Sequence, residues 1–220
     1  NQILEFNAEE RWVRVQPGVV LDELNAILKP DGLHFAPDVA TSSRATIGGM
    51  VSNNSAGAHS VKYGKTIDHV LALELILSDC SRTRWSTMSK AEVGAKMEQK
   101  DLEGQIFREV IRLARVHASE IESKYPKILR RVGGYNLDAF TGTTGDLFNL
   151  SKIVVGSEGT LGIIVEARIN LVPLPNAKAV LTIEFDELLD ALATTPAILE
   201  HHPSAVEVMD RSILDHAREN

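Results

Sequence analysis

The sequence has little cysteine, few aromatic residues and no long apolar run. Its single cysteine, Cys80, excludes an internal disulfide and a cysteine-held metal cluster within the chain. Apolar stretches stop short of the roughly 18 residues that span a bilayer, and the first residues form no basic, apolar, small-residue signal. We therefore expect no transmembrane segment. Cys80 directly follows an apolar run, which predicts a buried or half-buried thiol.

The chain also lacks the excess of positive charge that favours binding to nucleic acids and anionic membranes. Lysine and arginine number 23 against 30 aspartates and glutamates, which gives a net charge of −7. No nucleic-acid partner is therefore expected. Two basic groups, Arg82–Arg84 and Lys124–Arg131, are interpreted as solvated faces. The single cysteine is compatible with a reducing, cytoplasmic setting.

What the sequence does contain is a stretch rich in glycine, hydroxyl and amide side chains, from Ala36 to Gly64. Glycine lacks a Cβ, so a ligand can approach the main chain closely. Gly48 and Gly49, followed by apolar residues, predict a tight turn into a short buried segment. Such a surface suits a large polar ligand with phosphates and a heteroaromatic ring. The alternative is a solvated loop, although structureless loops of this length are uncommon in compact domains.

Around that stretch, the hydrophobic pattern predicts a mixture of strands and helices. The strands are predicted at 3–6, 12–15, 70–77, 82–86, 163–171, 180–185 and 205–209. Helices are predicted at 21–28, 106–121, 147–150 (with Asp146 as its cap) and 187–200, and another begins near residue 211. His117 lies beside the apolar stripe of the second helix and is expected to be packed and hydrogen-bonded. Pro126 should follow the end of that helix.

A second glycine-rich segment, Gly156–Gly162, precedes the strand 163–171. Taken alone, it fits a glycine-rich hairpin turn as well as a ligand-binding turn. Pro173 and Pro175 then break the strand and mark the best candidate domain boundary. The strand–helix–strand–helix order beyond them predicts the opening of a second α+β domain. The chain starts and stops inside predicted elements, so we interpret it as a segment of a longer protein.

Three ordered motifs resemble one known family. They are PGVVLDELN, PDVATSSRATIGGMVSNNSAGAHSVKYGKTIDHVLALELILSD and VGSEGTLGIIVEARINLVPLP. Together they resemble the FAD-binding domain of the vanillyl-alcohol oxidase / p-cresol methylhydroxylase (PCMH) family. The likeness is strongest to its D-2-hydroxyacid dehydrogenase branch, which includes D-lactate dehydrogenase, the glycolate oxidase flavin subunit and D-2-hydroxyglutarate dehydrogenase. The segment RRVGGYNLDAF is similar to large members that fuse a flavin module to an iron–sulfur module.

The resemblance implies an α+β fold with two parts. Residues 1–172 would form the second FAD-binding subdomain of the PCMH-type fold, a mixed or antiparallel sheet flanked by helices. Residues 173–220 would begin an α+β cap domain for the substrate. The pyrophosphate-binding glycine loop of the family would precede Asn1. Without that first subdomain a hydrophobic face would be uncovered, so self-association of this chain is expected.

The resemblance also implies which residues contact FAD, position by position. Pro37 and Asp38 would begin the loop along the flavin, and backbone N–H groups at Thr46, Ile47, Gly48 and Gly49 would face the pyrophosphate or ring. Asn53, Asn54, Ser55 and Gly57 would continue along the ribityl and phosphate side. Glu158, Gly159, Gly162, Ile163 and Ile164 would wrap the adenosine end.

The implied activity is FAD-linked oxidation of a D-2-hydroxy acid, with hydride transfer from its α-carbon to flavin N5. The catalytic residues of the branch would lie in the cap and beyond, so they are unknown and this chain alone should be inactive. The full protein would be cytoplasmic or peripheral at the inner membrane. His201 and His202 lack a partner at ligand spacing, so no metal site is predicted. His59 is expected to form hydrogen bonds rather than to attach a flavin.

A competing hypothesis assigns the chain to a different class of protein. It would be a nucleotide-binding or partner-docking module without redox activity.

Overall fold

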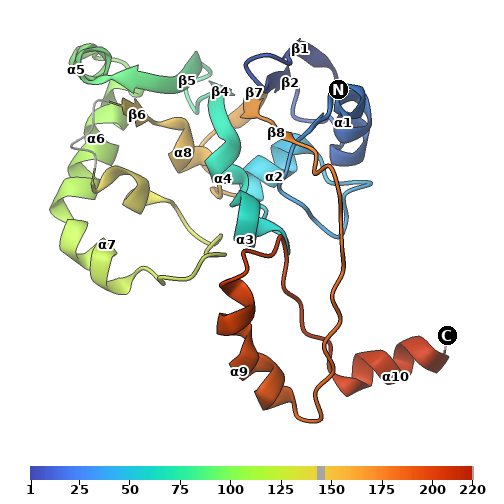
Figure 1. The fold of residues 1–220 in the computed structure, drawn as a ribbon. Helices are drawn as coiled ribbons and strands as arrows, with labels where there is room; N and C mark the ends of the chain where they lie inside the picture. Colours follow the sequence, from blue (N-terminus) through green and yellow to red (C-terminus); the bar gives the residue numbers. More distant parts are fainter. Residues whose placement is uncertain (143–146, 220) are drawn as a thin grey trace.

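The computed structural model describes residues 1–142 and 147–219, and its centre is a six-stranded antiparallel sheet (Figure 1). The strand order is β1-β2-β7-β4-β5-β6, and a small second sheet pairs β3 with β8. The strands are β1 Ile3–Asn7, β2 Trp12–Val15, β3 Leu33–His34, β4 Val70–Ile76, β5 Arg82–Ser89, β6 Leu147–Asn149, β7 Ile163–Asn170 and β8 Val172–Pro173. Strands far apart in the sequence therefore lie side by side at the centre, as β7 does between β2 and β4.

Helices cover one face of this sheet and both of its ends (Figure 1). They are α1 Leu21–Leu28, α2 Ile47–Asn53, α3 Ser60–Tyr63, α4 Thr66–His69, α5 Lys90–Glu98, α6 Leu102–Val116, α7 Ala118–Lys124, α8 Ser151–Val154, α9 Leu188–Leu199 and α10 Arg211–Glu219, with 3-10 turns at Lys29–Asp31 and Leu137–Phe140. The α+β fold with a helix-flanked antiparallel sheet, expected from the sequence, is confirmed.

The sheet has one apolar face and one charged face because successive side chains of a strand point to opposite sides. Val13, Leu73 and Ile169 are buried on the helix-covered face. On the other face Arg14 of β2 donates to Glu166 of β7 at 2.7 Å. Burying one aliphatic side chain of this size stabilises the fold by about 1.5–3 kcal/mol, so the apolar face fixes the register of the central strands.

The β4–β5 hairpin explains why the prediction for Cys80 is wrong. The apolar run ends at Leu77, and the turn that follows places Cys80 at φ 66° with its thiol exposed. Asp79 accepts hydrogen bonds from the backbone and hydroxyl of Ser81 at 2.9 and 2.6 Å, which lower the pKa of its carboxyl. The turn is therefore polar and solvated, and it lies outside the core.

The helical stretch before Pro126 is divided into separate helices. Asp101 caps α6 by accepting from the N–H of Gly104 at 2.9 Å, and α6 ends at Val116. His117 lies between α6 and α7, exposed, with Nδ1 3.4 Å from Glu120. The expectation that His117 is packed was wrong, because the chain turns there and carries the imidazole out of the apolar stripe.

Residues 147–149 form a strand, so the helix predicted at 147–150 was also wrong. Phe148 pairs with Met88 of β5, and Phe148 packs on Phe107 and Phe140 in the core. Pairing with a neighbouring strand thus outweighs the short helical pattern. The predicted cap, Asp146, lies outside the described residues.

An arm of residues 175–219 projects from the body of the molecule (Figure 1). Its helices α9 and α10 agree with the predicted helices, but 180–185 and 205–209 are not strands. Val180 is 94% exposed and Leu181 83% exposed. The alternating pattern needs a partner strand to form a ladder, and neither segment is paired with a strand among the described residues.

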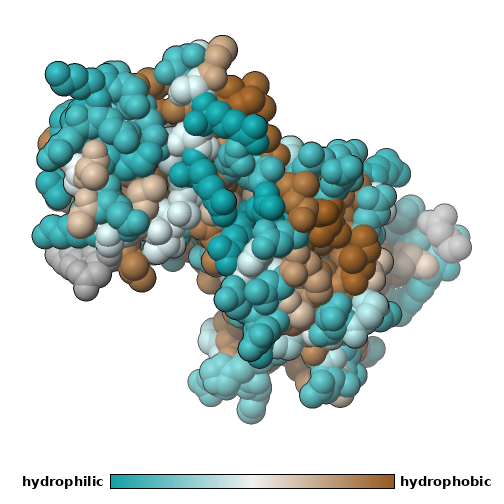
Figure 2. All heavy atoms as spheres, turned by 90° about the horizontal axis from the view of Figure 1, so that it is seen from above, coloured by the Kyte–Doolittle hydropathy of each residue, from teal (hydrophilic) through white to brown (hydrophobic). Residues whose placement is uncertain are grey.

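The outer surface differs between the two ends of the sheet. Figure 2 shows brown, apolar patches on the half of the molecule that carries β1, β2 and α1, whereas the half with α5, α6 and α7 is mostly teal. In β1, the edge strand, Ile3 and Phe6 are only half-buried. None of the helices in the described ranges is both long and apolar enough to cross a bilayer.

Candidate functional site

The two glycine-rich segments meet in the fold and form the walls of one cleft of about 430 Å³. The first segment supplies Thr46, the N-cap of α2, with Gly48, Gly49 and Ser52 of α2; the second supplies Gly159 and Gly162, and β7 adds Ile163 and Ile164. Pro17 and Gly18, between β2 and α1, complete the lining. Small-molecule sites typically enclose roughly 300–1,000 Å³, so this volume suits part of a large ligand.

Three hydrogen bonds join the segments across about 100 residues of chain. The N–H of Gly156 donates to the carbonyl of Val51, and the N–H of Glu158 donates to that of Ser52, both at 2.9 Å. The side chain of Asn53 donates to Glu158 Oε1 at 3.0 Å. The last turn of α2 is therefore fixed against the start of the turn 156–162.

Glycine at position 48 allows the chain to pack tightly at the floor of the cleft. A Cβ built on Gly48 would lie 2.5 Å from Pro17 Cβ, closer than carbon atoms can approach. The N–H of Gly48 donates to the carbonyl of Pro17 at 2.7 Å, and that of Ile47 to Val19 at 2.8 Å. α2 thus rests directly on the segment between β2 and α1.

These contacts correct the expected role of the α2 amides. The N–H groups of Ile47 and Gly48 are already bonded within the chain, and the N–H of Gly49 donates to Thr46 Oγ1 at 3.2 Å. They are not free to face a pyrophosphate. Gly48 and Gly49 are also helical residues rather than the predicted tight turn. Their contribution to the cleft is the space left by the missing side chains.

The second wall does offer a free donor. Glu158 and Gly159 have φ values of 52° and 75°, a left-handed conformation that glycine adopts without strain. The N–H of Gly159 donates to no atom among the described residues, and a Cβ there would meet nothing within 4 Å. Gly159 therefore lines the cleft with a main-chain donor that has no partner in the described part of the chain.

The chemistry of the lining is neutral. None of the ten lining residues carries a charge, and Pro17, Ile163 and Ile164 supply apolar surface. Ile163 is 67% exposed, although it begins the central strand β7. Ile163 and Ile164 could cover the face of a heteroaromatic ring, and the Gly159 N–H could bond a hydroxyl or phosphate oxygen.

Several predicted site residues lie away from the cleft lining and shape the loop instead. Pro37 is buried, and the carboxylate of Asp38 accepts from both the N–H and the Nδ1 of His59, at 3.2 and 2.8 Å. Gly57 lies against Asp38 so closely that a Cβ there would be 2.1 Å from the Asp38 carbonyl oxygen. The hydrogen-bonding role expected for His59 is confirmed.

Asn54 and Ser55 link the loop to α4. Asn54 is fully buried with φ 55°, and its Oδ1 accepts from the N–H of Ile67 at 3.0 Å. The carbonyl of Ser55 accepts from the hydroxyl of Thr66 at 2.8 Å. Both residues therefore support the wall of the cleft from behind.

One group of residues beside the cleft, although not in its lining, was not predicted from the sequence to take part in the site. Residues 125–136, which we call the bridging loop, connect α7 to the 3-10 turn 137–140. Arg131 was interpreted as part of a solvated face, but its side chain is only 12% exposed. It stacks on the Tyr125 ring at 4.8 Å and pairs with Asp138 at 2.6 Å. The alternation of basic, glycine and aromatic residues in RRVGGYN was the available signal.

A family comparison adds to this description of the cleft. Residues 1–85, from β1 into β5, match the family described as the FAD binding domain. This segment is thus similar to that family, and the cofactor that the match indicates is FAD.

The particular relatives are hydroxy-acid dehydrogenases and oxidases. The chain is 41% identical over 222 residues to the D-2-hydroxyglutarate dehydrogenase of Pantoea ananatis, covering 100% of this chain and 22% of the relative. It is 39% identical to that of Pseudomonas putida, over 97% of this chain and 21% of the relative. It is 30% identical to the glycolate oxidase subunit GlcD of Bacillus subtilis, over 97% of this chain and 35% of that relative. The chain thus spans about a fifth of the first two relatives.

A solved structure shows the same fold. It is that of an alkyldihydroxyacetonephosphate synthase, with a TM-score of 0.56 and 20% identity. The match covers 93% of this chain and 28% of the other.

Proposed function

We propose that this chain is part of an FAD-linked oxidoreductase that transfers a hydride from the α-carbon of a D-2-hydroxy acid to flavin N5. The observation that carries the proposal is the single neutral cleft made by both glycine segments. The relatives that match nearly the whole chain are named for D-2-hydroxyglutarate and glycolate. FAD supplies the hydride acceptor when bound, and this chain binds and orients it.

The residues of the chain divide into two groups under this proposal. Asn53 and Glu158, which are hydrogen-bonded to each other, would lie at the rim of the cleft. The residues in direct contact with FAD would be the predicted ones that line the cleft: Thr46, Gly48, Gly49, Gly159, Gly162, Ile163 and Ile164. The remaining predicted contacts would act by holding the loop: Pro37, Asp38, Ile47, Asn54, Ser55 and Gly57. This assignment rests on the hydrogen bonds described above.

Residues 173–220, which include the arm, would begin the cap domain. The apolar side chains of the arm are uncovered, as expected for surface that packs on further chain. The proton-accepting base, the substrate-binding residues and an iron–sulfur module would lie in other parts of the whole protein. A cytoplasmic location is part of the same proposal, and cell fractionation tests it.

The test uses this chain and the product of its complete gene. The chain is titrated with FAD and binding is followed by flavin fluorescence and absorption. The complete product is assayed for dye reduction with D-2-hydroxyglutarate, D-lactate and glycolate, and L-2-hydroxyglutarate and L-lactate serve as controls. A yellow protein that reduces dye with a D-hydroxy acid supports the proposal. A complete product that neither retains FAD nor reduces dye contradicts it.

The exposed apolar arm favours a second candidate, a partner-docking module without redox activity. Val180, Leu181 and Leu189 are each more than three-quarters exposed, at 94%, 83% and 77%. Light scattering of the purified chain over a concentration series measures the expected self-association. Association without FAD binding would favour this second candidate.

A further inference from the structure

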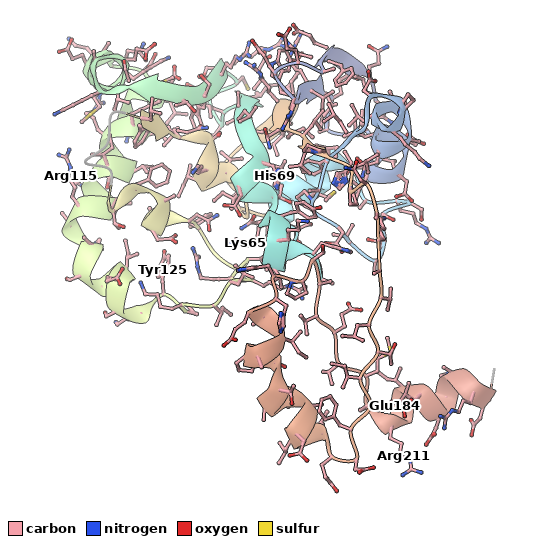
Figure 3. The ribbon with its side chains drawn as sticks, in the orientation of Figure 1. Lys65, His69, Arg115, Tyr125, Glu184 and Arg211 are labelled. Atoms are coloured by element: carbon pink, nitrogen blue, oxygen red, sulfur yellow. The ribbon has the colours of Figure 1, made fainter. Side chains whose placement is uncertain are left out.

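The bridging loop contacts residues that flank both glycine segments, although no part of it lines the cleft. Lys65, which follows the first segment, donates from Nζ to the carbonyl of Arg131 at 3.1 Å. Figure 3 shows Lys65 beside α3 and α4, and Tyr125 at the end of α7 where the loop begins. Asn136, 2% exposed, donates to the carbonyl of Val155 at 2.6 Å, next to the second segment. The loop therefore ties the two cleft walls together from outside.

Side chains of the loop hold its own shape. Besides its contacts with Tyr125 and Asp138, Arg131 donates to Asn136 Oδ1 at 3.3 Å. The hydroxyl of Tyr125 donates to the carbonyl of Tyr135 at 3.1 Å. Burial raises the pKa of the Tyr125 phenol, so this hydroxyl keeps its proton over the whole neutral range. The backbone of the bridging loop is thereby fixed at Tyr135, whose side chain reaches the turn 157–160.

The direction of the hydrogen bonds at that point can be deduced. Tyr135 Oη lies 2.9 Å from Thr160 Oγ1, and Thr160 Oγ1 donates to the carbonyl of Ser157 at 2.6 Å. A threonine hydroxyl has one proton. Tyr135 must therefore be the donor, which gives a chain from Tyr135 to Thr160 to Ser157. Hydrogen bonds in such a chain strengthen one another.

Resting on the function proposed above, we propose that Tyr135 is a positioning residue for the flavin nucleotide. Its hydroxyl holds the turn 157–160 in the conformation that presents the Gly159 N–H to the cleft. Tyr135 is 44% exposed and lies outside the core. The loss of its hydroxyl should therefore change the local geometry of the turn and leave global stability nearly unchanged.

Tyr135→Phe, made in the 220-residue chain, tests this proposal. Removing one hydrogen bond of ordinary net strength should weaken FAD affinity about five-fold. Amide hydrogen exchange in residues 157–162 should accelerate by a similar factor, and the melting temperature should stay within about 2 °C. A purely structural role would lower the melting temperature without a selective change at the turn.

The chain provides a matched control and a partner variant. Tyr63→Phe removes a hydroxyl that has no hydrogen bond within the described ranges, and it should leave both readouts unchanged. Thr160→Val removes the acceptor, so adding Tyr135→Phe to it should weaken FAD binding no further.

The outcomes separate this inference from the function on which it rests. If the unaltered chain binds FAD and Tyr135→Phe changes neither affinity nor exchange, the inference alone is overturned. If the unaltered chain and the complete gene product both fail to bind FAD, the proposed function fails and the positioning role fails with it.

Discussion

Two alanine substitutions of helical glycines should change stability in opposite directions. Gly48 is in α2 at the floor of the cleft, and Gly94 is in α5 on the surface. A Cβ on Gly48 would lie 2.5 Å from Pro17 Cβ and 3.0 Å from the Pro17 carbonyl oxygen, whereas a Cβ on Gly94 would meet nothing within 4 Å. The pair therefore separates helix propensity from close packing.

The magnitudes follow from these distances. Carbon atoms in contact are usually about 3.5–4.0 Å apart, so Gly48→Ala must move α2 from Pro17 by about 1 Å. Overpacking of this kind costs about 1–3 kcal/mol, while the gain in helix propensity is about 0.8–1 kcal/mol. Gly48→Ala should thus destabilise the chain by up to about 2 kcal/mol. Gly94→Ala should stabilise it by up to about 1 kcal/mol.

Thermal and urea unfolding measure both variants. For a chain of this size, 1 kcal/mol shifts the melting temperature by roughly 2–4 °C. We also expect Gly48→Ala to weaken FAD binding, because Pro17 and Gly48 both line the cleft. If Gly48→Ala were as stabilising as Gly94→Ala, the close contact between α2 and Pro17 would be refuted, and with it the steric requirement for glycine at position 48.

Three further predictions concern the cleft, the pH dependence and the arm. Gly49→Val should place its side chain in the cleft and abolish FAD retention while far-UV circular dichroism stays unchanged; retained FAD would contradict the cleft assignment. Burial, followed by the nearby positive charge of Lys178, lowers the pKa of His34 from 6.5. The unfolded chain therefore gains this proton at a higher pH, so unfolding free energy should fall below about pH 6.5, and less steeply in His34→Gln. If the unfolding free energy fell equally steeply with pH in the unaltered chain and in His34→Gln, His34 would not be the source of the pH dependence. Ending the chain at residue 175 should leave the melting temperature of the sheet within a few degrees, because the body then keeps the hydrogen bond from the Leu174 N–H to the Gly32 carbonyl at 2.8 Å.

The predicted elements agreed best with the fold where the spacing of apolar residues and the turn residues themselves cause the structure. The hairpin of β1 and β2, helix α1 and strands β4, β5 and β7 were all predicted from apolar spacing and turn residues. In these elements burial on one face and local turn chemistry favour the same structure. The likeness of the motifs to flavin-binding proteins was also apparent from residue order alone.

Long-range contacts decided the features that were predicted wrongly. Residues 147–149 became a strand because β5 lies beside them, and 180–185 did not because they are paired with no strand among the described segments. The buried setting of Arg131 depends on Tyr125 and Asp138 approaching it in space. Such contacts join residues that are distant in the sequence, so the local spacing of residue types does not predict them.

The sequence by itself determined that two glycine-bearing segments exist and that their side chains are small, neutral and able to form hydrogen bonds. Only the tertiary structure decided which of their amides remain free. The N–H groups at Ile47, Gly48 and Gly49 are bonded within the chain, while that of Gly159 has no partner among the described residues. The reason is physical: a backbone donor binds whichever acceptor the fold brings within about 3 Å, and only the folded chain fixes that distance.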